Sequence, residues 1–127
     1  MNDLDHAREL MVMAEKDYLA IAAMQFDATN FHDEVFGFHA QQAVEKSLKA
    51  WLAHLHVEYP LKHDLDILFD LLASSGCVVD NFRFAADLNV FAVEHRYESF
   101  KGEKSIDRPR VVVGVKMIME FVNDLLQ

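Results

Sequence analysis

Apolar residues recur every three or four positions along most of this chain, which is the spacing of one face of an α-helix. The first stripe predicts a long helix, and its members are Leu4, Ala7, Met11, Ala14, Tyr18 and Ile21. The second stripe predicts a helix that ends before Pro60, and its members are Phe36, Ala40, Ala43, Ser47, Leu48, Trp51 and Leu55. The pattern therefore predicts two long helices in the first half of the chain.

Shorter patterns predict a third and a fourth helix. Asp64 and Asp66 lie in the first turn of the third, where negative charge complements the helix dipole, and the Ser-Ser-Gly sequence at 74–76 ends it. Its stripe consists of Leu65, Leu68, Phe69 and Leu72. Asp80 is a candidate N-cap for the fourth helix. The apolar face of that helix consists of Phe84, Leu88, Phe91 and His95.

A fifth helix is predicted after residues 99–105, which lack periodicity and have the composition of an exposed loop. Pro109 suits the first turn of this helix, whose stripe is Val111, Val115, Ile118, Val122 and Leu125. The valines at 111–113 also suit a β-strand, but no second alternating run exists to pair with one. We therefore expect one all-α domain, residues 1–127, folded as an up-and-down antiparallel bundle of about five helices.

Composition and charge narrow the class of protein. The 127 residues are 52% apolar, with four Gly and two Pro, too few for a chain of many tight turns. The chain has a single cysteine, Cys77, and its N-terminal segment is acidic, which together predict a cytoplasmic protein. It has no long apolar run, which predicts that no segment spans a membrane. The net charge of −9 argues against general binding to nucleic acids or anionic membranes.

The basic residues are concentrated in two stretches, 41–62 and 101–110, so an anion site is expected to draw on these. Two lysines in the second helix, Lys46 and Lys49, are one turn apart and continue a polar stripe with His39 and Gln42. Such a line of donors suits a phosphate. The alternative is a solvated face on which Glu45 bridges to Lys49 four residues on.

Arg96 and Tyr97 end the fourth predicted helix. The arginine either stabilises the last carbonyls of its own helix, pairs with Glu45 or Glu94, or completes an anion pocket with Lys46. The candidate nucleotide- or anion-binding set is Lys46, Lys49, Arg96, Gln42, His39 and Tyr97.

Metal-binding and catalytic patterns are weak in this sequence. It has no Glu-x-x-His pair and no His-Glu-x-x-His. The residues His39, His63-Asp64 and Asp87 can only be forced into the order of the metal ligands of HD phosphohydrolases, because a dipeptide is a weak motif and the chain is short for that fold. We interpret His63-Asp64 as the start of the third helix. Neither Cys77 nor Ser99 lies in a glycine-flanked nucleophile elbow or has a recognisable general base. We assign no catalytic residue, metal ligand or cofactor.

Three segments together resemble the HEPN domain, the higher eukaryote and prokaryote nucleotide-binding domain. They are HAQQAVEKSLKA at 39–50, His63-Asp64-Leu65, and Leu88-Asn89, Phe91 and Arg96-Tyr97 in this order. The resemblance implies an up-and-down helical bundle that is commonly a homodimer. It also implies a small nucleotidyltransferase as partner, in several cases as a toxin–antitoxin pair, and many catalytic members are metal-independent ribonucleases.

The chain departs from the ribonuclease members, in which four to six residues separate an arginine from a histidine. After Arg96 those positions hold Lys101, Gly102 and Glu103, and no other arginine has a histidine at that spacing. Lys62 and Glu98 also stand where the family often has Thr and Pro. The reaction needs an imidazole to move the ribose 2′-hydroxyl proton and a cation for the phosphate, and only the cation is present.

The leading hypothesis is a non-catalytic HEPN module, a homodimer that binds a nucleotidyltransferase partner and a nucleotide phosphate in a substrate-binding or toxin–antitoxin-like regulatory role. The alternative is a HEPN ribonuclease toxin with a non-standard histidine, either His95 beside Arg96 or His39. Neighbouring side chains on a helix diverge by about 100°, so His95 and Arg96 are poorly placed to act on one phosphate. Whether the chain is an enzyme stays open, with the missing motif favouring no.

Overall fold

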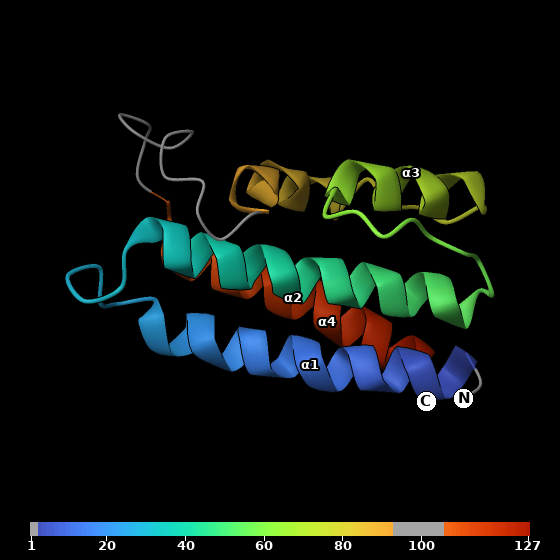
Figure 1. Cartoon of the computed structure of the whole chain (residues 1–127), viewed down its shortest axis with the longest axis horizontal. Helices are drawn as coiled ribbons and strands as arrows, with labels where there is room; N and C mark the ends of the chain where they lie inside the picture. The colour runs from blue at the N-terminus through green and yellow to red at the C-terminus, as the bar shows by residue number, and fades with distance from the viewer. Residues whose placement is uncertain (1–2, 93–105) are drawn as a thin grey trace.

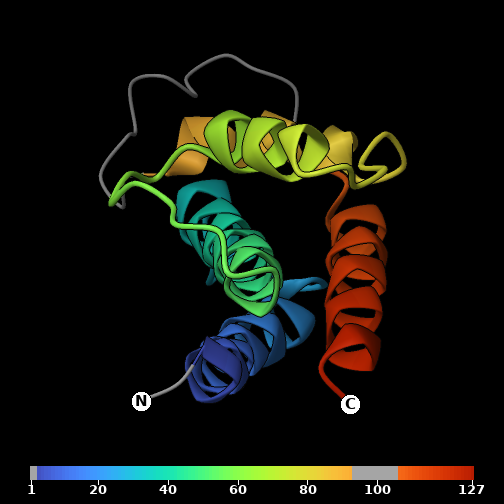
Figure 2. The same ribbon diagram turned by 90° about the vertical axis from the view of Figure 1, so that its right-hand side faces the viewer.

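The computed structural model of the protein describes residues 3–92 and 106–127 (Figure 1). The helices in this part of the chain are α1 (Asp3–Met24), α2 (Asp33–His54), α3 (Leu65–Ser74), the 3-10 helix η1 (Arg83–Phe91) and α4 (Arg108–Leu125). α1 and α2 run antiparallel, side by side. Viewed from the end, α2 lies between α1 on one side and α3 with η1 on the other, and α4 flanks it (Figure 2). The predicted all-α helical bundle is confirmed.

Local sequence explains where the later helices begin and end. The Asp64 carboxylate caps α3 by accepting the N–H of Asp66 at 2.9 Å, which confirms the structural interpretation of this aspartate. Gly76 follows α3 with a φ of +91°, a conformation that glycine adopts without strain. Asp107 caps α4, and Pro109 lies in its first turn as expected. The valines at 111–113 are helical.

The fourth element differs from the α-helix that the sequence pattern predicted. It is a 3-10 helix preceded by Phe82, so Asp80 is not its N-cap. Three residues per turn bring every third side chain to one face, and the core-facing residues follow this period: Phe82, Ala85, Leu88 and Phe91. Phe84, expected on the apolar face, is therefore 48% exposed. His95, Arg96 and Tyr97 lie outside the described residues.

The core is built around α2, which contacts each of the other four helices. Leu48 and Trp51 are buried on α2, and Leu88 and Phe91 are buried on η1. The Trp51 ring packs against Phe121 of α4, with ring centroids 4.9 Å apart. Along α1 the predicted stripe is buried except at Leu4, which is exposed, and at Tyr18, which is half-buried. Among the described helices, none has the length and apolar character needed to cross a membrane.

One buried arginine fixes α4 to the connection between α1 and α2. Arg108 is 5% exposed, and its guanidinium donates to the carbonyl of Met24 at 3.0 Å and to that of Phe31 at 2.6 Å. It also donates to the Asp33 carboxylate at 2.7 Å and stacks over the Phe36 ring. Five N–H donors in a planar fork allow one side chain to satisfy all these acceptors.

Candidate functional site

The polar side chains of α2 face neighbouring parts of the chain. His39 and Lys46 are two helical turns apart on α2, and both reach Asp17 on α1. The His39 Nδ1 lies 2.9 Å from one carboxylate oxygen, and the Lys46 ammonium donates to the other. Asp17 is only 8% exposed. An unpartnered carboxylate would be unstable at such a site, so the two basic groups stabilise it there.

The pKa of Asp17 reflects this balance. Burial by itself would raise the pKa of the carboxyl, but the hydrogen bonds from His39 and Lys46 and their positive charge outweigh it and lower the pKa below its ordinary value of 3.8. Because an ionised carboxylate only accepts hydrogen bonds, the Nδ1 of His39 carries the proton in this pair. The carboxylate thereby orients the imidazole ring.

A second buried carboxylate belongs to Glu45, which precedes Lys46 on α2 and is 3% exposed. It accepts hydrogen bonds from the Gln41 amide at 3.0 Å, the Lys49 ammonium at 3.1 Å and the His63 ring at 3.0 Å. Gln42 in turn donates to the Gln41 side-chain oxygen at 2.7 Å. The pairing of Glu45 with Lys49, which the sequence offered as the alternative to an anion site, is therefore formed.

The network around Glu45 extends to the N-terminal turns of α1 through Tyr59. The Lys49 ammonium lies 5.3 Å from the centroid of the Tyr59 ring, a cation–π contact. The Tyr59 hydroxyl lies 2.7 Å from the Nε2 of His6. Burial and the nearby Glu45 charge raise the pKa of Tyr59, so it stays a neutral hydrogen-bonding group.

The segments that resembled one family in sequence meet in space. Glu45 belongs to the first segment and pairs with His63 of the second. The side-chain oxygen of Asn89, in the third segment, accepts the N–H of Leu65 at 2.8 Å, and its amide group donates to Asp64 at 3.1 Å. Asn89 thus holds η1 against the start of α3. Because His63 and Asp64 are adjacent in the chain, these two sets of contacts together connect α2, the start of α3 and η1.

The structure brings together four of the six predicted site residues in two adjacent groups. His39 and Lys46 bind Asp17, while Gln42 and Lys49 belong to the network of Glu45. The side chains of Lys46 and Lys49 are only 18% and 12% exposed. Arg96 and Tyr97 lie outside the described residues, so their convergence on Lys46 stays a prediction.

Sequence reasoning missed Asp17 and Asn89. Asp17 stands among the apolar positions of α1, three residues after Ala14 and four before Ile21, and an acidic residue in such a stripe signals a buried partner. Asn89 carried no signal beyond the family resemblance. His39 and His63 bind different carboxylates and Asp64 caps a helix, so the order that suggested an HD site does not correspond to one cluster. Within residues 3–92 and 106–127, no three His, Cys, Asp or Glu side chains are placed to hold a metal.

The model of the HEPN domain family matches residues 7–125, which covers all three segments and nearly all of the described helices. No curated protein and no solved structure matches the chain significantly.

Proposed function

The chain belongs to the HEPN domain family, and from this premise we propose that it is a non-catalytic, homodimeric, cytoplasmic module that binds a nucleotidyltransferase and regulates it or presents a nucleotide to it. The observation that carries the proposal is the state of the two lysines of α2. Lys46 and Lys49 are each held by a carboxylate of the same chain, and both are mostly buried. The pairing therefore leaves no extended positive surface on α2 for a long polyanion such as RNA, whereas a single phosphate needs only the N–H donors that the carboxylates do not use.

The missing histidine supports the same proposal. No arginine in the sequence is followed by histidine after four to six residues, so the family's ribonuclease chemistry has no proton-transfer group at its usual place. A module without its own chemistry acts through a partner. The test is to co-express the chain with a small nucleotidyltransferase encoded beside it and to measure the mass of the complex by light scattering. Separate elution of the two proteins would contradict partner binding.

The proposed nucleotide site uses Lys46, Lys49 and Arg96. An ammonium has three N–H donors, and Asp17 accepts one from Lys46, which leaves others for a phosphate. Calorimetry with ATP or GTP, without magnesium, tests this site. We expect heat of binding and a raised melting temperature for the wild type, and loss of both in Arg96→Ala and Lys46→Ala. Lys116→Ala removes an exposed lysine of α4 and is the matched control. Absence of heat in the wild type would leave a protein-binding module only.

A ribonuclease that uses His39 is the second candidate, and one observation favours it. Asp17 orients the His39 ring through Nδ1, as the carboxylate of a catalytic triad orients its histidine, and the ring is 32% exposed. Lys46 is the nearby cation. Cleavage of a single-stranded RNA that is lost in His39→Ala, but kept in His54→Ala, would support this candidate. A wild-type protein that cleaves no RNA would exclude it.

A further inference from the structure

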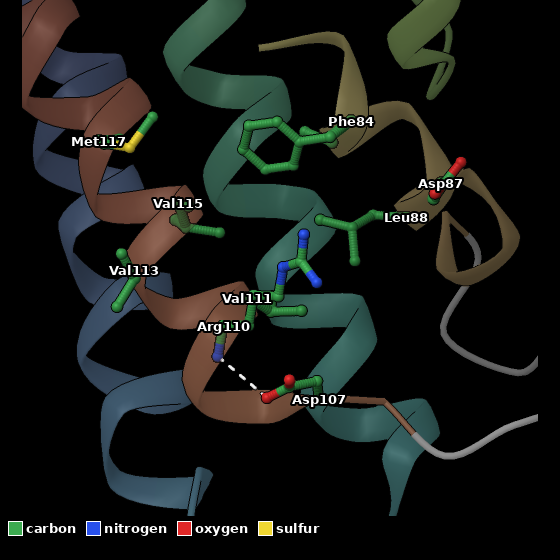
Figure 3. Close-up of a pocket in the computed structure, with 11 residues that line it drawn as sticks. Phe84, Asp87, Leu88, Asp107, Arg110, Val111, Val113, Val115 and Met117 are labelled. Atoms are coloured by element: carbon green, nitrogen blue, oxygen red, sulfur yellow. Dashed lines mark hydrogen bonds between the residues drawn. The ribbon is translucent and has the colours of Figure 1, made fainter. Parts of the chain in front are cut away.

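The outer face of α4 carries an exposed apolar stripe. Val113 is 61% exposed, Met117 47% and Phe121 39%. Because they are spaced by four residues, they form one line along the helix. Beside this α4 stripe lies an apolar groove of about 630 Å³ between α4 and η1, lined by Phe84 and Leu88 as well as by Val113 and Met117 (Figure 3). Side chains of this kind are normally covered when they gather on one face.

Two opposite charges mark the ends of the stripe. Arg110 stands at its N-terminal end and lines the groove, and Asp124 stands at its C-terminal end. Both are exposed. Their side chains have no hydrogen bond or ion pair with any residue of the described ranges 3–92 and 106–127. Arg108, two residues before Arg110, is by contrast fully engaged inside the chain.

The α4 stripe is complementary to itself when one copy is turned around. Arg110 and Asp124 lie seven residues before and after Met117, and Val113 and Phe121 lie four residues before and after it. Two copies of α4 placed antiparallel about a two-fold axis at Met117 would bring each Arg110 opposite an Asp124. The same axis brings Val113 opposite Phe121 and Met117 opposite itself. In a two-fold interface, each such contact occurs twice.

We propose that α4 is the surface through which two copies of this chain pair, antiparallel and with Met117 on the two-fold axis. The inference rests on the proposed self-association and adds its surface and register. One side of each Phe121 ring packs against Trp51 and Phe82 of its own chain, and its exposed side lies against Val113 of the second copy. Charge selects this arrangement, because a parallel pairing would place Arg110 against Arg110 and Asp124 against Asp124.

The first experiment is sedimentation velocity of the full chain over a range of concentrations. We expect a dimer for the wild type and a dissociation constant raised about 100-fold or more in Met117→Glu, since the two-fold axis places the two new charges together. Leu19→Glu is the matched control: Leu19 is also exposed, at 57%, but lies on α1, and this variant should stay dimeric. Circular dichroism and thermal unfolding check that each variant is folded.

The second experiment tests the register by charge exchange. Arg110→Asp or Asp124→Arg alone places like charges opposite each other and should weaken the dimer about 10-fold. The double variant restores opposite charges and should recover most of the wild-type affinity. A wild-type monomer would refute self-association and the surface together. A dimer that survives Met117→Glu would refute only the surface, and a double variant no better than the single ones would refute the register.

Discussion

The carboxylates of α1 and α2 and the charged residues on the outer face of α4 differ in how they are paired. The carboxylates of Asp17 on α1 and Glu45 on α2 are buried, and each is satisfied by basic and polar groups of the same chain. On α4, Arg110 and Asp124 are exposed, without partners among the described residues, and the stripe between them is apolar. The first set is complete within one chain. The outer face of α4 has the features of a surface that another molecule completes.

Within the described residues, the segments that resemble the HEPN family lie in α2, at the start of α3 and in η1, and not on the exposed face of α4. The resembling segments supply the polar network that joins α2, α3 and η1, and such a network fixes the arrangement of the helices because each member needs the others. The exposed positions of α4 play no part in this network. The polar network that holds these helices together is thus separate from the α4 stripe, whose Phe121 nevertheless contacts the core through Trp51 and Phe82.

The strongest test of the core that joins the two regions is Trp51→Ala. Trp51 belongs to α2 but packs against Phe82 and Phe121, with ring centroids 6.2 Å and 4.9 Å away. Removing the indole leaves a cavity, and we expect the free energy of unfolding to fall by ~3–5 kcal/mol. Urea denaturation measures this loss. A loss below about 1 kcal/mol would show that Trp51 is not part of the core.

Two arginines separated by one residue sharpen the comparison. Arg108→Ala leaves the Asp33 carboxylate and two carbonyls without their donor, and we expect a loss of about 3–5 kcal/mol. Arg110→Ala, measured at concentrations where the chain is monomeric, should change stability by less than about 0.5 kcal/mol. Equal effects in urea denaturation would contradict the distinction between a structural and an available arginine.

Two helical glycines provide a smaller test. A methyl group at Gly37 would overlap the ring of Phe91, which is buried, so Gly37→Ala should cost about 1–3 kcal/mol. A methyl group at Gly114 would lie 2.7 Å from the ring of Phe84, which is 48% exposed and has room to turn away. Gly114→Ala should therefore be near neutral, since the gain in helix propensity offsets the contact. Thermal unfolding of both variants would show whether the two sites differ.

The smallest expected effect concerns the titration of Asp17. Because its pKa in the folded protein is below the ordinary 3.8, the unfolded chain takes up the proton first as the pH falls. The stabilisation is therefore complete above this value and is lost as the pH falls through the folded pKa. Asp17→Asn should lose roughly 1 kcal/mol near neutral pH, and its difference from the wild type should shrink in acid. Asp27, whose pKa is lowered by Asn30, is present in both proteins and does not affect the difference. Urea denaturation at several pH values measures this difference in the free energy of unfolding. A difference that stays the same at every pH would contradict the role of the Asp17 charge.

The sequence by itself determined the helices and the pairings within a helix. A helix rotates its side chains by a fixed angle per residue, so apolar spacing predicted α1, α2, α3 and α4, and aspartate, proline and glycine marked several of their ends. The pairing of Glu45 with Lys49 follows from the same rotation. The α-helix predicted around Phe84 was wrong because the period of three, which buries Phe82 and Ala85 instead of Phe84, becomes clear only when the face packed against α2 is known.

Only the tertiary structure decided which helix faces which. Asp17 and His39 are 22 residues apart, Asp17 and Lys46 are 29 apart, and Leu65 and Asn89 are 24 apart. Spacing along the chain does not define such pairs, because the relative rotation and sliding of two helices depend on how all their side chains pack together. The same packing decides that Arg108 is buried while Arg110 stays exposed, although both lie in the first turn of one helix. Sequence periodicity fixes directions around a helix, and the packing of the whole chain fixes what lies in each direction.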